Sequence, residues 1–208
     1  FKNNIYVGTE QGISIIDIKT SKISTPKIPK TKQDFICIDF FVYHNDVYFI
    51  SVFDGVFKID ESSNSPKIVP VYLRSNFYSA FLDNENLHLS NEGFIEKINI
   101  QELLHKNFKL VQFGNSIIHQ YAKVQDSIIF AAADGVYNPD GGLYTIGNNK
   151  MINVSNQFGI DSKKILNVVY DKLRNVLYVG SNDKGIYEIR LDAQIKYEDF
   201  QNLSIVDF

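Results

Sequence analysis

The side chains that could carry chemistry are few in this chain of 208 residues. The single cysteine, Cys37, stands in the apolar run 35–38 and is interpreted as a core residue. No Gly-x-Ser-x-Gly motif and no glycine-rich phosphate loop occurs. The histidines show no His-x-His or His-x-x-x-His spacing, so they predict no metal site. They are His44, His88, His105 and His119. We therefore expect no cofactor, no metal and no catalytic nucleophile.

Carboxylates define the enzymatic alternative, a glycoside hydrolase, which needs two of them about 5–10 Å apart. Asp34 precedes an expected inner strand, and Asp39 lies within it. Asp171 and Asp207 occupy one position of the repeat described below, which indicates a structural role in the following turn. One acid without clear partners is weak support for a hydrolase, and we expect a non-catalytic protein.

Composition and charge exclude several other classes. The net charge is −3 and 44% of the residues are hydrophobic, as in an ordinary folded protein. No cluster of Lys and Arg suits a nucleic-acid backbone. No apolar stretch approaches the roughly 20 residues that cross a bilayer, so we expect no membrane insertion by this segment. The chain starts within a strand and has no initiator Met, which indicates a single domain, 1–208, excised from a longer protein.

A repeat of about 40 residues organises the chain. Each copy has an apolar strand, a turn that closes on glycine, and a strand in which polar and apolar residues alternate. Copies start at Ile5, Val47, Leu87, Ile128 and Leu177, which lie 42, 40, 41 and 49 residues apart. This period predicts an all-β fold, a five-bladed β-propeller with four-stranded antiparallel blades.

The two ends of the chain supply complementary parts of one blade. A further apolar strand precedes four of the hairpins, in 35–41, 77–82, 117–122 and 165–170. The first hairpin has none before it, whereas 203–207 offers such a strand with no hairpin after it. Joined to the start, Asp207 lies six residues before Ile5, as Asp171 lies six before Leu177. We expect the C-terminal strand to close the first blade; the alternative is an arc of a larger propeller.

The fifth copy resembles a known family. It reads Phe-Gly-Ile-Asp-Ser-Lys-Lys-Ile-Leu-Asn-Val-Val-Tyr-Asp in 158–171, then Asn-Val-Leu-Tyr-Val-Gly-Ser in 175–181 and Lys-Gly-Ile-Tyr-Glu-Ile in 184–189. This string resembles the two-component regulator propeller repeat, and the first copy is similar to it around residues 5–13. The chain departs from the family pattern because it has no Trp. The resemblance implies a bacterial sensor ectodomain, periplasmic or extracellular, coupled to a kinase or regulator outside this sequence.

Loops that lead into the inner strands of a propeller gather at one face, where ligand sites form. Here they carry amides, cations and aromatic rings that suit a small polar ligand or an oligosaccharide. The ligand-binding candidates are Asp34, Arg74, Asn76, Tyr78, His119, Lys163 and Asn167. We expect a ligand- or signal-binding sensor. The alternative is an interaction scaffold that binds a protein partner, or a second copy as a homodimer, through its rim or a sheet edge.

Overall fold

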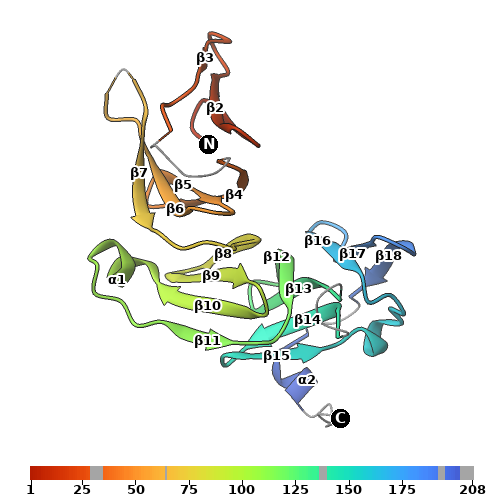
Figure 1. The fold of residues 1–208 in the computed structure, drawn as a ribbon. Helices are drawn as coiled ribbons and strands as arrows, with labels where there is room; N and C mark the ends of the chain where they lie inside the picture. The colour runs from red at the N-terminus through yellow and green to blue at the C-terminus, as the bar shows by residue number, and fades with distance from the viewer. Residues whose placement is uncertain (29–34, 64, 136–139, 192–194, 202–208) are drawn as a thin grey trace. The chain divides into compact units, whose positions relative to one another are not determined.

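The computed structural model describes residues 1–28, 35–63, 65–135, 140–191 and 195–201. In these residues the chain forms strands joined by tight turns, with two short α-helices (Figure 1). The fold is all-β, as the alternating pattern predicted. In the described part of the chain, no helix has the length and apolar character needed to span a membrane.

The described strands form five sheets, and in each of them the strands lie in chain order. The first sheet holds β1 (Asn4–Thr9), β2 (Gly12–Asp17) and β3 (Ile23–Ser24). The second holds β4 (Cys37–Tyr43), β5 (Asp46–Ser51), β6 (Gly55–Asp60) and β7 (Lys67–Tyr72). The third holds β8 (Ser79–Asp83), β9 (Asn86–Asn91), β10 (Phe94–Asn99) and β11 (Val111–Phe113). The fourth holds β12 (Ile117–Val124), β13 (Ile128–Asp134), β14 (Gly142–Gly147) and β15 (Lys150–Asn153). The fifth holds β16 (Ile165–Asp171), β17 (Val176–Ser181) and β18 (Gly185–Arg190).

A β-bulge recurs near the start of the first strand of three sheets. The register of β4 skips Ile38, that of β12 skips His119 and that of β16 skips Leu166. A bulge turns the following side chain to a new direction and increases the local twist. The first residues after the three bulges are Asp39, Gln120 and Asn167.

The chain divides into two compact units, each with its own core. The first unit comprises Phe1–Leu89 and Lys97–Leu110, and the second comprises Ser90–Glu96 and Val111–Phe208. The first unit also contains α1 (Ile100–Leu104). Asn99 caps it, because its Oδ1 accepts the N–H groups of Gln101 at 3.0 Å and Glu102 at 3.1 Å.

The two faces of β5 belong to different hydrophobic clusters of the first unit. Val47 and Phe49 share one cluster with Ile13 and Ile15 of β2. Tyr48 and Ile50 point to the other face, because side chains alternate along a strand, and they share a second cluster with Leu87 and Leu89. β5, the apolar strand of its repeat, is therefore buried on both faces.

The core of the second unit is a single cluster in which aromatic rings meet. Phe130 of β13 packs edge-on against Phe158 at 5.9 Å and Phe200 at 6.2 Å between ring centroids. Phe200 belongs to α2 (Glu198–Gln201), which follows the last strand. Buried aliphatic residues of β16 and β17, including Val168, Leu177 and Val179, complete the cluster.

The first and last sheets differ from the expected four-stranded blade, because each has three strands in the described residues. The strand expected to complete the first sheet, 203–207, lies outside the described residues. Residues 195–201, the described part of the chain that follows Leu191, form no strand of this sheet. Ile195 instead donates its N–H to Gln125 Oε1 at 2.9 Å, and Tyr197 donates its hydroxyl to the Gly147 carbonyl at 2.9 Å. Packing of these residues and Phe200 in the second unit's core explains the missing fourth strand.

Candidate functional site

A group of polar side chains lies at the N-terminal ends of β12 and β16 in the second unit. We call these four residues the β12–β16 polar cluster: His119, Gln120, Asp134 and Asn167. His119 sits in the bulge of β12, and Gln120 follows it. Asp134 ends β13 and lies opposite Ile117. The bulges of β12 and β16, the first strands of two neighbouring sheets, therefore bring the side chains of Gln120 and Asn167 close together.

The histidine and the aspartate of this cluster form a pair. His119 Nε2 lies 3.8 Å from Asp134 Oδ2, and the two side chains are 31% and 16% exposed. Burial lowers the pKa of His119, and the negative charge of Asp134 opposes that shift. At neutral pH the imidazole is therefore mostly uncharged, and it can offer one donor and one acceptor nitrogen.

The two amides of the cluster connect adjacent strands. Gln120 Oε1 accepts hydrogen bonds from Asn167 Nδ2 at 3.2 Å and from the Val168 N–H at 3.1 Å. The exposed Asn167 side chain is thus held in place by Gln120. A fixed amide loses less freedom when it binds a ligand than a mobile one does.

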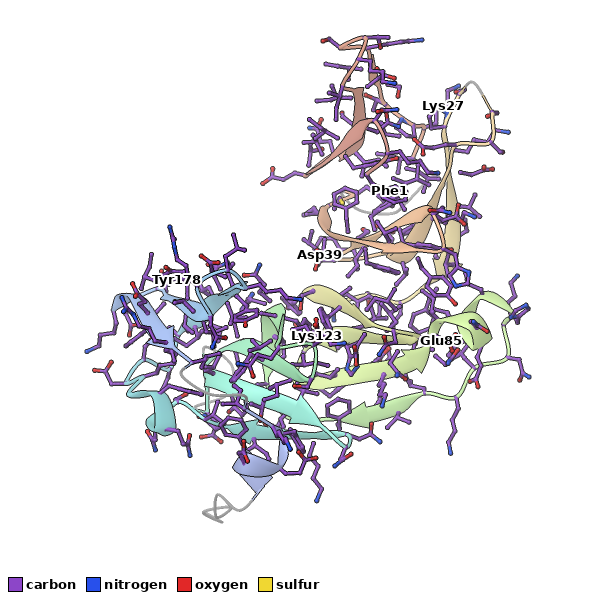
Figure 2. All side chains as sticks on the ribbon, turned by 180° about the vertical axis from the view of Figure 1, so that it is seen from behind. Phe1, Lys27, Asp39, Glu85, Lys123 and Tyr178 are labelled. Carbon is purple, nitrogen blue, oxygen red and sulfur yellow. The ribbon has the colours of Figure 1, made fainter. Side chains whose placement is uncertain are left out.

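The first unit uses the same position after a bulge for the same purpose. Asp39, labelled in Figure 2, accepts the Ala80 N–H through Oδ2 at 3.1 Å and the Phe40 N–H through Oδ1 at 2.8 Å. Burial raises the pKa of Asp39, although both N–H groups favour its charged form. This aspartate joins β4 to β8, which is a structural role rather than that of a free catalytic acid.

The loop that leads into β16 borders the polar cluster. The Lys163 carbonyl accepts the Gly135 N–H at 2.9 Å, and Lys164 forms an antiparallel bridge with Asp134. Ser162 Oγ donates to Asp183 Oδ1 at 2.5 Å. The backbone of this loop is therefore fixed, while the side chain of Lys163 remains exposed.

The other candidates from the sequence lie in the first unit. Arg74 Nη1 donates to the Tyr72 hydroxyl at 3.5 Å. Asn76 adopts φ 68° and donates its N–H to the Val52 carbonyl at 2.7 Å, which indicates turn chemistry. Tyr78 is half-buried just before β8. Asp34 lies outside the described residues.

Of the seven candidates, His119 and Asn167 lie on the neighbouring strands β12 and β16, where Gln120, the residue after His119, accepts a hydrogen bond from Asn167; the backbone of Lys163 contacts Gly135. Sequence reasoning missed Gln120 and Asp134. Asp134 belongs to the Asp-Gly turn of the fourth repeat. The position of Gln120 directly after His119, on a strand expected to be inner, was the signal that could have identified it.

The carboxylates considered for glycoside hydrolysis have other roles where the structure describes them. Asp171 Oδ1 accepts the N–H groups of Leu173 at 3.0 Å and Arg174 at 3.2 Å, which confirms its predicted turn role. Asp34 and Asp207 lie outside the described residues. Cys37 is buried as predicted, and burial, with a smaller effect of Asp39, raises the pKa of its thiol to about 12. No three His, Cys, Asp or Glu side chains in the described segments gather as a metal site would require.

Comparison with known proteins identifies the fold. No family model matches the sequence, and no curated protein is a significant match. The chain resembles the extracellular domain of BT4673 from B. thetaiotaomicron, described as a one-component or hybrid two-component system. The TM-score is 0.69 at 16% identity, over 93% of this chain and 27% of that one. A second such domain, that of BT3049, gives a TM-score of 0.68 at 14% identity, over 91% of this chain and 26% of that one.

A eukaryotic propeller is also similar. The β-propeller domain of Cps50 (Swd1) from Myceliophteria thermophila gives a TM-score of 0.64 at 14% identity, over 92% of this chain and 63% of that one. The five sheets are therefore of the β-propeller type. The bacterial neighbours are sensor ectodomains, as the resemblance of the fifth repeat predicted. The chain spans about a quarter of their length.

Proposed function

We propose that this chain is a non-catalytic, ligand-binding propeller segment of a bacterial two-component sensor that lies outside the cytoplasmic membrane. The β12–β16 polar cluster carries the proposal. It joins a neutral histidine, a carboxylate and two amides at the partly exposed ends of neighbouring strands. Donors and acceptors in fixed positions suit the hydroxyl groups of an oligosaccharide or another small polar ligand.

A thermal-shift screen against a broad panel of glycans tests the proposal. A ligand present at 100 times its dissociation constant should stabilise the protein by about 2.7 kcal/mol. We expect His119→Ala and Asn167→Ala to reduce the shift, because each removes a polar group from the cluster. Gln120 is left intact, since it also holds the Val168 N–H.

Lys172→Ala is the matched control for these variants. Lys172 follows the opposite end of β16, where it is exposed and pairs with Asp126 at 3.3 Å. It should respond to the ligand as the unaltered protein does. A panel without any shift, or a shift that both cluster variants retain in full, would contradict the proposed site.

For the fold, we propose the closed five-bladed ring that the repeat predicts, with 203–207 as the inner strand of the first blade. The exposure of β1 supports this proposal. Ile5 is 51% exposed, whereas Val47, at the same position of the second repeat, is 3% exposed. In a closed ring, the strand 203–207 and the neighbouring fifth blade would cover Ile5, so that it would be buried as Val47 is.

An interaction scaffold is the second candidate function. It is favoured by one observation in the second unit, the open edge of β18 in the described residues. A sheet edge presents backbone donors and acceptors that another chain can use.

A further inference from the structure

The outer edge of β18 is an interaction surface that the ligand proposal does not use. In the other four sheets the third strand of the repeat is followed by an outer strand, namely β3, β7, β11 or β15. Among the described residues, β18 has no such neighbour. Gly185, Ile186, Glu188 and Arg190 of β18 are also exposed.

The chain itself turns away from this edge. Leu191 still pairs with the second strand of the sheet, through its N–H to the Asn175 carbonyl at 3.0 Å. Ile195 and Tyr197 then bond to Gln125 and Gly147, which follow β12 and end β14. From Ile195 to the end of α2, the described chain therefore lies against the fourth sheet instead of along β18.

One face of β18 combines an apolar residue with two opposite charges. Ile186, Glu188 and Arg190 share this face, because side chains alternate along a strand. Ile186 is 76% exposed, whereas Val56, which follows the same turn glycine in the second sheet, is 0% exposed. Arg190 Nε donates to Glu188 Oε1 at 3.2 Å, and both side chains are largely open to solvent. Tyr178 of β17, labelled in Figure 2, lies on the same face.

We propose that the β18 edges of two copies of this chain pair antiparallel about a twofold axis at Ile189. In that register Glu188 of one copy lies opposite Arg190 of the other, and the reverse contact forms as well. A register centred on Glu188 would place two carboxylates opposite each other, and one centred on Arg190 would place two guanidinium groups opposite each other. Opposite charges across a strand pair stabilise it, and like charges destabilise it.

Registers centred between two residues are excluded by the faces of the sheet. They would pair residues whose side chains lie on opposite faces. The register centred between Glu188 and Ile189, for example, places Glu188 opposite the buried Ile189 of the other copy. A shift by one residue moves every side chain to the wrong face. The register centred on Ile189 pairs residues 187–191 of the two copies, keeps each face continuous and pairs all four charges. A second copy is therefore the occupant that the charges of this edge favour.

Sedimentation of the 208-residue chain over a range of concentrations tests the proposal. We expect a reversible monomer–dimer equilibrium. Arg190→Glu alone, or Glu188→Arg alone, should raise the dissociation constant by about tenfold or more, because like charges then face each other. An equimolar mixture of these two variants should dimerise again, since each supplies the charges that the other lacks. A chain with both substitutions should also dimerise.

Lys172→Glu is the matched control, because it reverses an exposed charge away from β18. It should dimerise as the unaltered chain does. Thermal unfolding of every variant shows whether it folds. A chain that stays monomeric, a dimer that both single reversals leave unchanged, or single variants that do not recover on mixing would each overturn the proposal. Glycan binding is measured separately, so failure of one proposal leaves the other intact.

Discussion

At the scale of single residues, burial decides which polar groups serve structure. His88 of β9 stands where other repeats have Tyr48 or Tyr178, and it is buried. Burial lowers its pKa to about 4, and a positive charge on Lys97 adds to the effect. His119 is also shifted downward but keeps partial exposure beside Asp134. The first histidine belongs to the core, and the second can meet a ligand.

The buried His88 predicts a loss of stability in acid. Its pKa is about 4 in the folded chain and about 6.5 when unfolded, so the unfolded state binds the proton first. Stability should therefore fall as the pH drops from about 6.5 towards 4, by about 3 kcal/mol in total from this group. Urea unfolding at a series of pH values measures this slope.

The control for that prediction is His88→Tyr, which places the aromatic residue of the related repeats at the same position. It should remove this part of the pH dependence while carboxylates such as Asp39 remain. If the slope between pH 6.5 and 4 is the same in both proteins, His88 is not its source.

At the scale of elements, two turn glycines make a matched pair. Gly55 begins β6 with φ 111°, and Gly185 begins β18 with φ 83°. A Cβ at Gly55 would lie 2.0 Å from the Tyr72 carbonyl oxygen and 2.8 Å from the Arg74 backbone nitrogen. A Cβ at Gly185 would meet nothing within 4 Å. The positive φ disfavours a side chain at both positions. At Gly55, backbone atoms also occupy the space that a Cβ would need.

We therefore expect Gly55→Ala to destabilise the chain by at least about 2 kcal/mol more than Gly185→Ala. The difference arises because the backbone of Tyr72 and Arg74 must move to admit a Cβ at Gly55. Gly185→Ala is destabilised only by the positive φ of that position. Chemical denaturation of the two variants measures it. An equal loss of unfolding free energy in the two variants would mean that the backbone of β7 at Tyr72 moves aside at little cost.

The sequence was sufficient for the elements that have a strong period. The strands before the second to fifth hairpins and the turns that close on glycine were predicted. The bulges were not, because a bulge leaves no mark in apolar alternation when the skipped residue is itself Ile38 or Leu166. The bonds from Gln120 to Val168 and from Asp39 to Ala80 join residues more than 40 positions apart, so no local pattern could reveal them.

At the scale of the whole molecule, the two terminal sheets are where the repeat is incomplete. Each leaves exposed an apolar position that is buried in the second sheet, Ile5 in the first sheet and Ile186 in the fifth. The repeat predicts that 203–207 belongs to the first sheet, and among the described residues no strand lies along the outer edge of β18. The first sheet is therefore expected to be completed by this chain, and the edge of the fifth by another copy.

Deletion of 203–208 tests the first of these expectations. If 203–207 pairs with β1, the deletion should expose the inner edge of that strand, and its amides, such as that of Tyr6, should exchange hydrogen much faster. We expect a loss of about 2 kcal/mol in the free energy of unfolding, since one strand and its apolar contacts are removed. The amides of β5 have β4 and β6 as neighbours and serve as the internal reference. Unchanged exchange in β1 would instead favour an arc of a larger propeller, in which a blade from elsewhere must cover Ile5.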